Sequence, residues 1–162
     1  MVKPSASNPP VRRRDAAATR AAILQAAHNR FMRESYDSVG LRDIAGDAGV
    51  DVALISRYFG GKEGLFSEVL WPDHAPDFTP PNESDNLVDY LTQLVTDEDE
   101  DERDHRMKMF VIMLRSASSP KAGKIIRQRV NDDVLQPLIA ILDPEAAAWR
   151  ANMLLAVMMG IG

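Results

Sequence analysis

The side chains that could carry chemistry in this chain do not form a catalytic or metal-binding set. The sequence has no cysteine, and no serine or carboxylate pair stands out as a catalytic group. The three histidines are far apart and show no metal-ligand spacing; they are His28, His74 and His105. We therefore expect a protein that is not an enzyme and that has no cofactor and no bound metal.

Hydrogen-bond donors and cations gather instead between residues 42 and 62. Guanidinium, ammonium and hydroxyl groups can all donate to phosphate oxygens. The donors in this stretch are Arg42, Ser56, Arg57, Tyr58 and Lys62. What they can reach depends on the elements that position them.

Two short helices are predicted to position these donors. Apolar residues at steps of three, four and seven predict the first helix over 41–48. Its apolar face consists of Leu41, Ile44, Ala45 and Ala48. Gly49 ends this helix, because glycine readily takes the left-handed conformation of a tight exit. Asp51 is placed to accept from free N–H groups at the start of a second helix over 52–59.

The second helix buries Ile55 and Phe59 and turns its other side chains outward or sideways. These are Val52, Ala53, Leu54, Ser56, Arg57 and Tyr58. Two short helices across a Gly-containing turn form a helix-turn-helix (40–59), whose second helix can enter the major groove of DNA. Arg57 can donate to guanine or to a phosphate, whereas the apolar residues offer contacts only to thymine methyls. A face with so few donors favours binding through DNA shape and phosphate contacts.

The residues on both sides of this motif extend the interpretation. Upstream, 19–31 has the apolar spacing of a helix, and downstream a further helix begins with Lys62 in its first turn. From about Ala16 to Leu70 the chain resembles, without a gap, the N-terminal domain of the tetracycline-repressor (TetR) family of transcriptional regulators. The matching residues are Thr19-Arg20, Ile23-Leu24, Ala26-Ala27, Phe31, Tyr36, Ile44-Ala45, Ala48-Gly49-Val50, Tyr58-Phe59, Lys62-Glu63 and Leu65.

The chain departs from the usual family pattern at four positions. Ser35 stands where the family usually has Gly, Gly40 where it has Thr, and Asp51 where it has Ser. Ser56 occupies a position that is often Tyr and that often touches a phosphate or a thymine methyl. Because serine has a shorter reach, the DNA sequence bound is less predictable than the fold.

The resemblance implies a set of DNA contacts. Lys62 would combine its charge with free backbone N–H groups at a helix start, which suits a phosphate. Residues of the first and second helices would contact the backbone as well. The predicted DNA-binding residues are Thr19, Arg20, Arg42, Val52, Ala53, Leu54, Ser56, Arg57, Tyr58 and Lys62. The cluster Arg12–Arg14 could reach a minor groove or could belong to a solubilising tail.

Charge is divided unevenly along the 162 residues, whose formal net charge is −5. Residues 1–70 carry ten Lys/Arg against eight Asp/Glu, hence +2, and residues 71–162 carry nine against sixteen, hence −7. A basic end fits phosphate binding, which needs local positive potential. The longest apolar stretch, 153–159, is well short of the roughly 20 residues that span a bilayer. There is no secretory signal, so we expect a cytoplasmic protein.

The chain is predicted to divide into an N-terminal arm, a helix-turn-helix domain, a connection and a second helical domain. Residues 1–15, rich in proline and arginine, are expected to be a disordered arm. The helix-turn-helix domain is assigned to 16–70 and a proline-rich connection to 71–82. Residues 83–162 are expected to form a helical ligand-binding and dimerisation domain. We expect this domain to be cut short, since the last helix would leave Met158, Met159 and Ile161 exposed.

Within the second domain, apolar spacing predicts four helices. The first begins near Ser84-Asp85. The second runs from about Glu100 to Ser116, and the third begins at Pro120 and is kinked or divided at Pro137. The fourth begins near Asp143-Pro144. The expected inner faces are Leu87, Tyr90, Leu91, Leu94 and Val95; Met107, Phe110, Val111 and Leu114; Ile125, Ile126, Val130, Val134, Leu138 and Ile141; and Trp149, Met153, Leu154 and Val157.

Two other features of the second half have a functional and a plain interpretation. Residues 97–104 include seven acids among eight residues, without the spacing and the glycine of a calcium loop. This pattern instead predicts a solvated loop that leads into the start of a helix. Methionines are concentrated after residue 106, where they could line an apolar effector pocket, fill the core, or form a dimer face. The candidate pocket residues are Met107, Phe110, Met113, Leu114, Trp149 and Met153.

The sequence thus predicts an all-α protein: a helix-turn-helix domain of three helices joined through a fourth helix to a helical regulatory and dimerisation domain. The resemblance implies a homodimer that binds a palindromic double-stranded DNA operator, as a repressor released by a small-molecule effector of unknown identity. Two alternatives remain: a helical small-molecule-binding protein without operator specificity, and an architectural protein that coats DNA non-specifically. Because the late helix and its successor supply the dimer interface in similar proteins, we expect these 162 residues to dimerise poorly.

Overall fold

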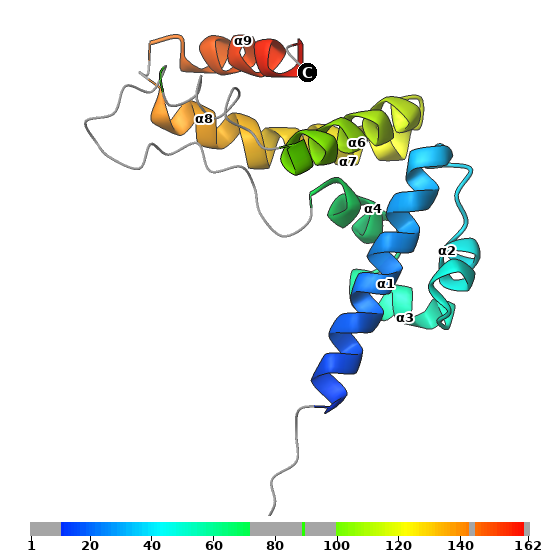
Figure 1. The fold of residues 1–162 in the computed structure, drawn as a ribbon. Coiled ribbons are helices and arrows are strands. Elements are labelled where there is room, and N and C mark those ends of the chain that lie inside the picture. Colours follow the sequence, from blue (N-terminus) through cyan, green and yellow to red (C-terminus); the bar gives the residue numbers. More distant parts are fainter. Residues whose placement is uncertain (1–10, 72–88, 90–99, 143–144, 161–162) are drawn as a thin grey trace, which may run out of the picture.

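The computed structural model describes residues 11–71, 89, 100–142 and 145–160, without the side chains of 11–15, 101–103, 106 and 157–160. All regular structure in these ranges is helical, which confirms the predicted fold class (Figure 1). The first four helices are α1 (Val11–Arg33), α2 (Leu41–Ala48), α3 (Val52–Phe59) and α4 (Lys62–Leu70). The later ones are α6 (Glu100–Ser116), α7 (Pro120–Val130), the π-helical η1 (Asn131–Leu135), α8 (Gln136–Ile141) and α9 (Ala147–Gly160). We call residues 11–71 the head and residues 100–160 the second region.

The head is closed around one apolar core. Helix α1 packs on α2 and α4, and α3 packs on α2 and α4. The Phe66 ring meets those of Phe31 and Tyr36 edge-on, with both centroid distances 4.9 Å. Such aromatic pairs contribute about 0.5–1.5 kcal/mol beyond the burial of their surface. The core also includes Ile23, Ala27, Val39, Ile44, Ile55, Phe59, Leu65, Val69, Leu70 and Trp71.

The turn between α2 and α3 forms as its residue types predict. Gly49 has a left-handed φ of 67°, and the N–H of Val50 donates to the carbonyl of Ala45 at 3.0 Å. Asp51 caps α3, since its Oδ1 accepts from the N–H of Ala53 at 2.7 Å. The exit from α3 uses two further glycines with positive φ, Gly60 and Gly61. The predicted bounds of both helices are confirmed.

Gly64 lets α4 approach the end of α3 closely. A Cβ atom at this position would lie 1.9 Å from the carbonyl oxygen of Phe59, far inside van der Waals contact. That oxygen belongs to backbone and cannot rotate away as a side chain could. The angle between α3 and α4 therefore depends on the absence of a side chain at residue 64.

In the second region, α6 packs on α1 and α4, and α7 packs on α4. Helix α7 begins as predicted, with Ser119 as its cap and Pro120 in its first turn. The predicted division near Pro137 is also confirmed, because the π-helical η1 separates α7 from α8, which has this proline in its first turn. Proline lacks an N–H and crowds the preceding turn, which a wider π turn can accommodate. Helix α9 lies on α8 and η1 (Figure 1).

Helix α1 is longer than the sequence predicts. It begins at Val11, so that Arg12–Arg14 belong to the helix and not to an arm that reaches residue 15. The difference has a local cause, since Pro9 and Pro10 are the last prolines before it and the following arginines and alanines are good helix formers.

The inner face predicted for α6 is wrong. Ile112 and Ser116 are buried, and Met109 and Met113 pack against the core, whereas Leu114 of the predicted face is 60% exposed. Residues 109–114 are all apolar, so two stripes with helical spacing exist in α6. The positions of α1 and α4 decide which of them is buried.

The inner face predicted for α9 is wrong as well, for a similar reason. Trp149 is 65% and Met153 is 50% exposed, while Ala147 and Ala151 face the core. Small side chains on that side let α9 approach its neighbours closely. Leu154 packs against the core as predicted, and Val157 lies outside the side chains that are described.

Several predictions fall on residues outside the described ranges. These include nearly all of the connection 71–82, the helix expected from Ser84-Asp85, and residues 1–10 of the arm. Among the helices that are described, none is both long enough and apolar enough to cross a membrane.

Candidate nucleic-acid interface

The outer face of α3 is available for contact. Val52, Ala53, Ser56 and Arg57 are exposed, while Leu54 and Tyr58 are half-buried at its edges. On the opposite side Ile55 and Phe59 are buried in the head and anchor the helix. The sequence therefore predicted correctly which side chains face outward. Their contacts with DNA remain a prediction.

Ion pairs hold α1 against the helix-turn-helix and against α4. Arg30 of α1 donates to both carboxylate oxygens of Asp47, at 2.5 Å from Nε and 2.9 Å from Nη2, and so fixes the end of α2. This hydrogen bonding lowers the pKa of Asp47 below its usual value. Arg20 forms an ion pair with Glu68 of α4, and its guanidinium carbon lies 5.3 Å from the centroid of the Phe59 ring.

These contacts give Arg20 a role that the sequence did not suggest. It was predicted to touch the DNA backbone, but its guanidinium group is already engaged between α3 and α4. Glu68 was not singled out, because only the fold brings it to α1. Of the other predicted backbone contacts, Arg42 is exposed on α2 and Thr19 is half-buried on α1.

Lys62 lies at the start of α4, as predicted, but its side chain folds back over the head. Its Nζ is 4.5 Å from the centroid of the Tyr36 ring, which is a cation–π contact. Burial lowers the pKa of Lys62, the charge of Asp37 opposes this shift, and Lys121 adds to it. The ammonium group is therefore partly desolvated, which strengthens its interaction with any anion that replaces water.

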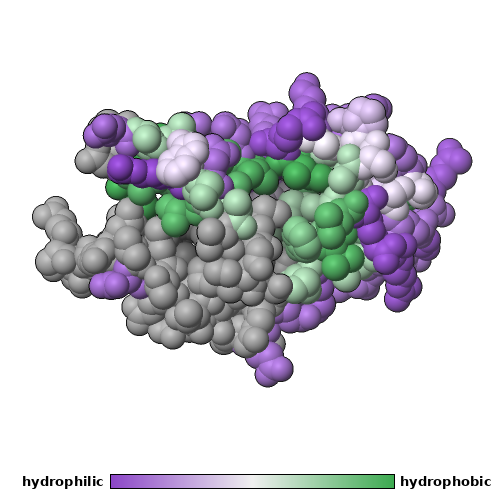
Figure 2. Space-filling model, turned by 90° about the horizontal axis from the view of Figure 1, so that it is seen from above, coloured by the Kyte–Doolittle hydropathy of each residue, from purple (hydrophilic) through white to green (hydrophobic). Residues whose placement is uncertain are grey.

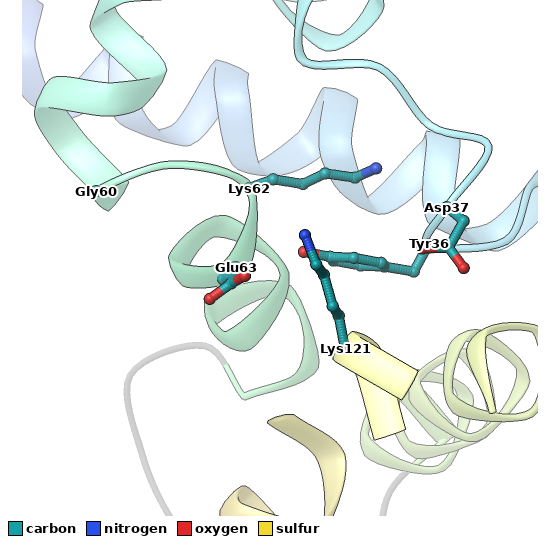
Figure 3. Close-up of a pocket in the computed structure, with 6 residues that line it drawn as sticks. All are labelled: Tyr36, Asp37, Gly60, Lys62, Glu63 and Lys121. Carbon is teal, nitrogen blue, oxygen red and sulfur yellow. The ribbon is translucent and has the colours of Figure 1, made fainter. Parts of the chain in front are cut away.

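A pocket of about 390 Å³ surrounds this lysine. Figure 3 shows the Lys62 side chain over the Tyr36 ring, with Lys121 reaching from α7 toward the same ring. Asp37, Gly60 and Glu63 complete the lining. Lys121 could not be predicted as part of this site, because it lies 59 positions after Lys62 and nothing in the residues around it marks it.

A second pocket, of about 440 Å³, lies between α1, α4 and α6. It brings together His28 and His105, which the sequence analysis treated as unrelated. Burial lowers the pKa of His28, and the nearby charges of His105 and Lys108 lower it further. In the described part of the chain, no three histidine, cysteine or acidic side chains are arranged to hold a metal ion.

The six residues predicted to line an effector pocket lie on two helices, and the pocket itself stays a prediction. Met107, Phe110, Met113 and Leu114 lie on α6, which packs on α1, α4 and α7, whereas Trp149 and Met153 lie on α9, which packs on α8 and η1. Neither pocket above includes any of them. Four of the six, Met107, Leu114, Trp149 and Met153, are exposed. Seen from above, the molecule carries several groups of apolar side chains at its surface (Figure 2).

The sequence matches two family models that together cover most of the chain. Residues 23–69 match the model of bacterial regulatory proteins of the tetR family. Residues 85–162 match the model of the tetracyclin repressor-like C-terminal domain. The protein therefore belongs to the tetR family of bacterial regulators, as the resemblance of its first seventy residues predicted.

Solved structures with the same fold include two bacterial proteins. NalD, described as the secondary repressor of the MexAB-OprM multidrug efflux pump in Pseudomonas aeruginosa, superposes with a TM-score of 0.71 at 18% identity, over 90% of this chain and 83% of that one. GusR from Salmonella enterica gives a TM-score of 0.67 at 24% identity, over 88% of this chain and 81% of that one. At these identities the likeness establishes the fold. The chain has no match among curated proteins.

Proposed function

We propose that the protein is a sequence-specific transcription regulator that binds a palindromic operator as a homodimer and is released from it by a small-molecule effector, hence a repressor. The observation that carries the proposal is the α3 face: a capped helix, anchored by Ile55 and Phe59, presents Arg57 and a row of small and apolar side chains to solvent. Only an exposed, rigid helix can enter a major groove without reorganising. Release by an effector requires that the effector bind the DNA-incompetent arrangement better.

The experiment is a selection from a random duplex library with the purified protein, followed by titrations on the selected duplex and on a scrambled one. Arg57→Ala should weaken binding to the selected duplex by about 1–3 kcal/mol and reduce the preference over the scrambled duplex. Arg127→Ala, which removes an exposed arginine of α7, is the matched control and should leave both values unchanged. Failure to enrich any sequence would favour non-specific DNA coating.

Lys62 provides a second test with a different signature. A phosphate contact releases counterions but reads no base, so Lys62→Ala should weaken binding about equally on both duplexes and lower the salt slope by about one. Lys124→Ala, at an exposed position of α7, serves as the control. A loss confined to the selected duplex would mean that Lys62 reads bases.

A further inference from the structure

The turn between α6 and α7 contains two buried hydroxyl groups. Ser116 is 0% and Ser119 is 2% exposed, and among the described residues these are the buried polar side chains. Burying a hydroxyl group without a hydrogen bond is unfavourable, so the partners of each serine matter.

Both serines bond to the loop between α1 and α2, about eighty residues away in sequence. Ser116 Oγ accepts from the backbone N–H of Tyr36 at 3.2 Å. Ser119 Oγ donates to Asp37 Oδ1 at 2.9 Å and also accepts from the N–H of Ala122 at 3.4 Å, as the cap of α7. We call Ser116, Ser119, Tyr36 and Asp37 the serine junction. It joins the second region to the loop that leads into the helix-turn-helix.

The two loop residues of the serine junction, Tyr36 and Asp37, also line the pocket around Lys62. The Tyr36 ring carries the lysine ammonium 4.5 Å from its centroid, and the Asp37 carboxylate favours the charged form of the lysine. The Tyr36 ring also makes an edge contact with the Phe66 ring of α4, with the two centroids 4.9 Å apart. A displacement of the loop would therefore move the ring and the carboxylate away from Lys62 together.

We propose that Ser116 and Ser119 are positioning residues for the DNA contact of Lys62, so that the second region acts on DNA binding through the serine junction. With the junction closed, the lysine is ordered on the tyrosine ring beside the start of α4. A side chain that is already ordered loses less conformational entropy when it meets a phosphate. With the junction open, this preorganisation is lost and binding weakens. The inference rests on the proposed function, because it takes Lys62 to contact DNA.

A double-mutant cycle on the selected duplex tests this proposal. Ser119→Ala and Ser116→Ala should each weaken binding by about threefold to tenfold in the otherwise unchanged protein, and by less than about twofold when Lys62 is already alanine. The single variants should also lower the salt slope toward that of Lys62→Ala. Ser118→Ala, at the exposed neighbouring position, should change neither value.

Two variants are needed because Ser119 also caps α7. Ser116→Ala leaves that cap intact, so a loss of helix stability cannot account for its effect. Hydrogen exchange in the free protein follows the serine junction without DNA, and the Tyr36 amide should exchange faster in Ser116→Ala than in Ser118→Ala. Unchanged exchange would overturn the proposal, because the bond would not be constraining the loop.

The DNA outcomes separate this proposal from the proposed function. If the serine variants weaken binding by the same factor with and without Lys62, or if they tighten it, the positioning role is wrong and the protein still binds DNA. If the unchanged protein enriches no duplex, the proposed function fails and the positioning role fails with it. Strong coupling to Lys62 together with faster Tyr36 exchange supports the proposal.

Discussion

The head and the second region bury their apolar side chains to different extents. In the head, aromatic and branched residues from all four helices meet in one centre. Among the side chains described there, the large apolar one that stays exposed is Val52 on the outer face of α3. In the second region the buried set is smaller and includes several alanines, while Leu114 and Trp149 are mostly exposed. The head closes on itself, whereas the second region leaves apolar surface that its described residues do not cover.

From this difference we propose where each region meets other molecules. An exposed apolar side chain loses little by being solvated singly, but a group of them favours association. On α3 the exposed apolar residues fit the groove contacts proposed above. On α6 and α9 the exposed apolar residues suit contact with another protein, in keeping with a dimer formed through the second region.

The largest expected effect comes from adding a methyl group where the head is tightest. Gly64→Ala places a Cβ 1.9 Å from the Phe59 carbonyl oxygen, and the backbone must shift to relieve it. We expect the free energy of unfolding to fall by about 3 kcal/mol, the upper range for overpacking. Thermal unfolding monitored by circular dichroism measures this loss.

Gly46→Ala is the matched control for this prediction. Gly46 is inside α2 with no atom near the position of an added Cβ. Replacing a glycine within a helix should stabilise the head by about 0.5–1 kcal/mol. If the two variants unfolded at similar temperatures, the close contact between α3 and α4 would not exclude a side chain at residue 64.

The second region should reveal its open surface by weak self-association. A stable dimer buries roughly 800 Å² of each partner, and Trp149 and Met153 offer the beginning of such a face. We expect sedimentation to show a concentration-dependent equilibrium and not a tight dimer. Trp149→Lys should raise the dimer Kd by about thirtyfold, as loss of a hot spot of about 2 kcal/mol does.

The control is Gln128→Lys, which adds the same charge at an exposed position of α7. It should leave the sedimentation profile unchanged. A tight dimer that persists in Trp149→Lys would exclude α9 and leave the interface to the helices around Leu114 and Val130. Dimerisation would then not depend on the exposed side chains of α9.

Local rules predicted the local parts of the head well. Gly49 and Asp51 act within a few residues of their own positions, so the bounds of α2 and α3 could be read from the chain alone. Pro120 marked the start of α7 for the same reason. In each case the neighbours along the sequence supply the bonds that decide the structure.

Features that depend on distant residues could not be predicted in this way. The buried stripe of α6 was misjudged because both of its stripes have helical spacing, and only packing on α1 and α4 selects one. The contact of Arg20 with Glu68 and the approach of Lys121 to Lys62 join residues about fifty or sixty positions apart. The sequence therefore predicts which side chains of the candidate site are donors. It does not predict the residues that contact them in the fold.

The cap of α3 offers a test of intermediate size. Asp51→Ala removes the carboxylate that accepts from the N–H of Ala53 at 2.7 Å, and should lower the free energy of unfolding by about 1 kcal/mol. Asp51→Asn keeps an acceptor in the same place and should stay close to the unchanged protein. Chemical denaturation with urea measures both. Equal losses in the two variants would show that charge, and not the cap bond, stabilises this helix.

The smallest expected effect concerns the start of α2, where the head lacks a side-chain cap. Gly40 has the extended backbone of a capping residue (φ −94°, ψ 143°) but no side chain with which to accept. Gly40→Ser should stabilise the head by a few tenths of a kcal/mol, since the new hydroxyl can accept from a free N–H of α2. The gain is limited because the Asp43 carboxylate lies 2.6 Å from the position of the new Cβ and must rotate away. Gly40→Ala carries the same Cβ without the hydroxyl, so the serine variant should be more stable than it by about 1 kcal/mol. If serine and alanine gave the same midpoint in urea, the start of α2 would gain nothing from a cap. The free N–H groups at the start of α2 would then not limit the stability of the head.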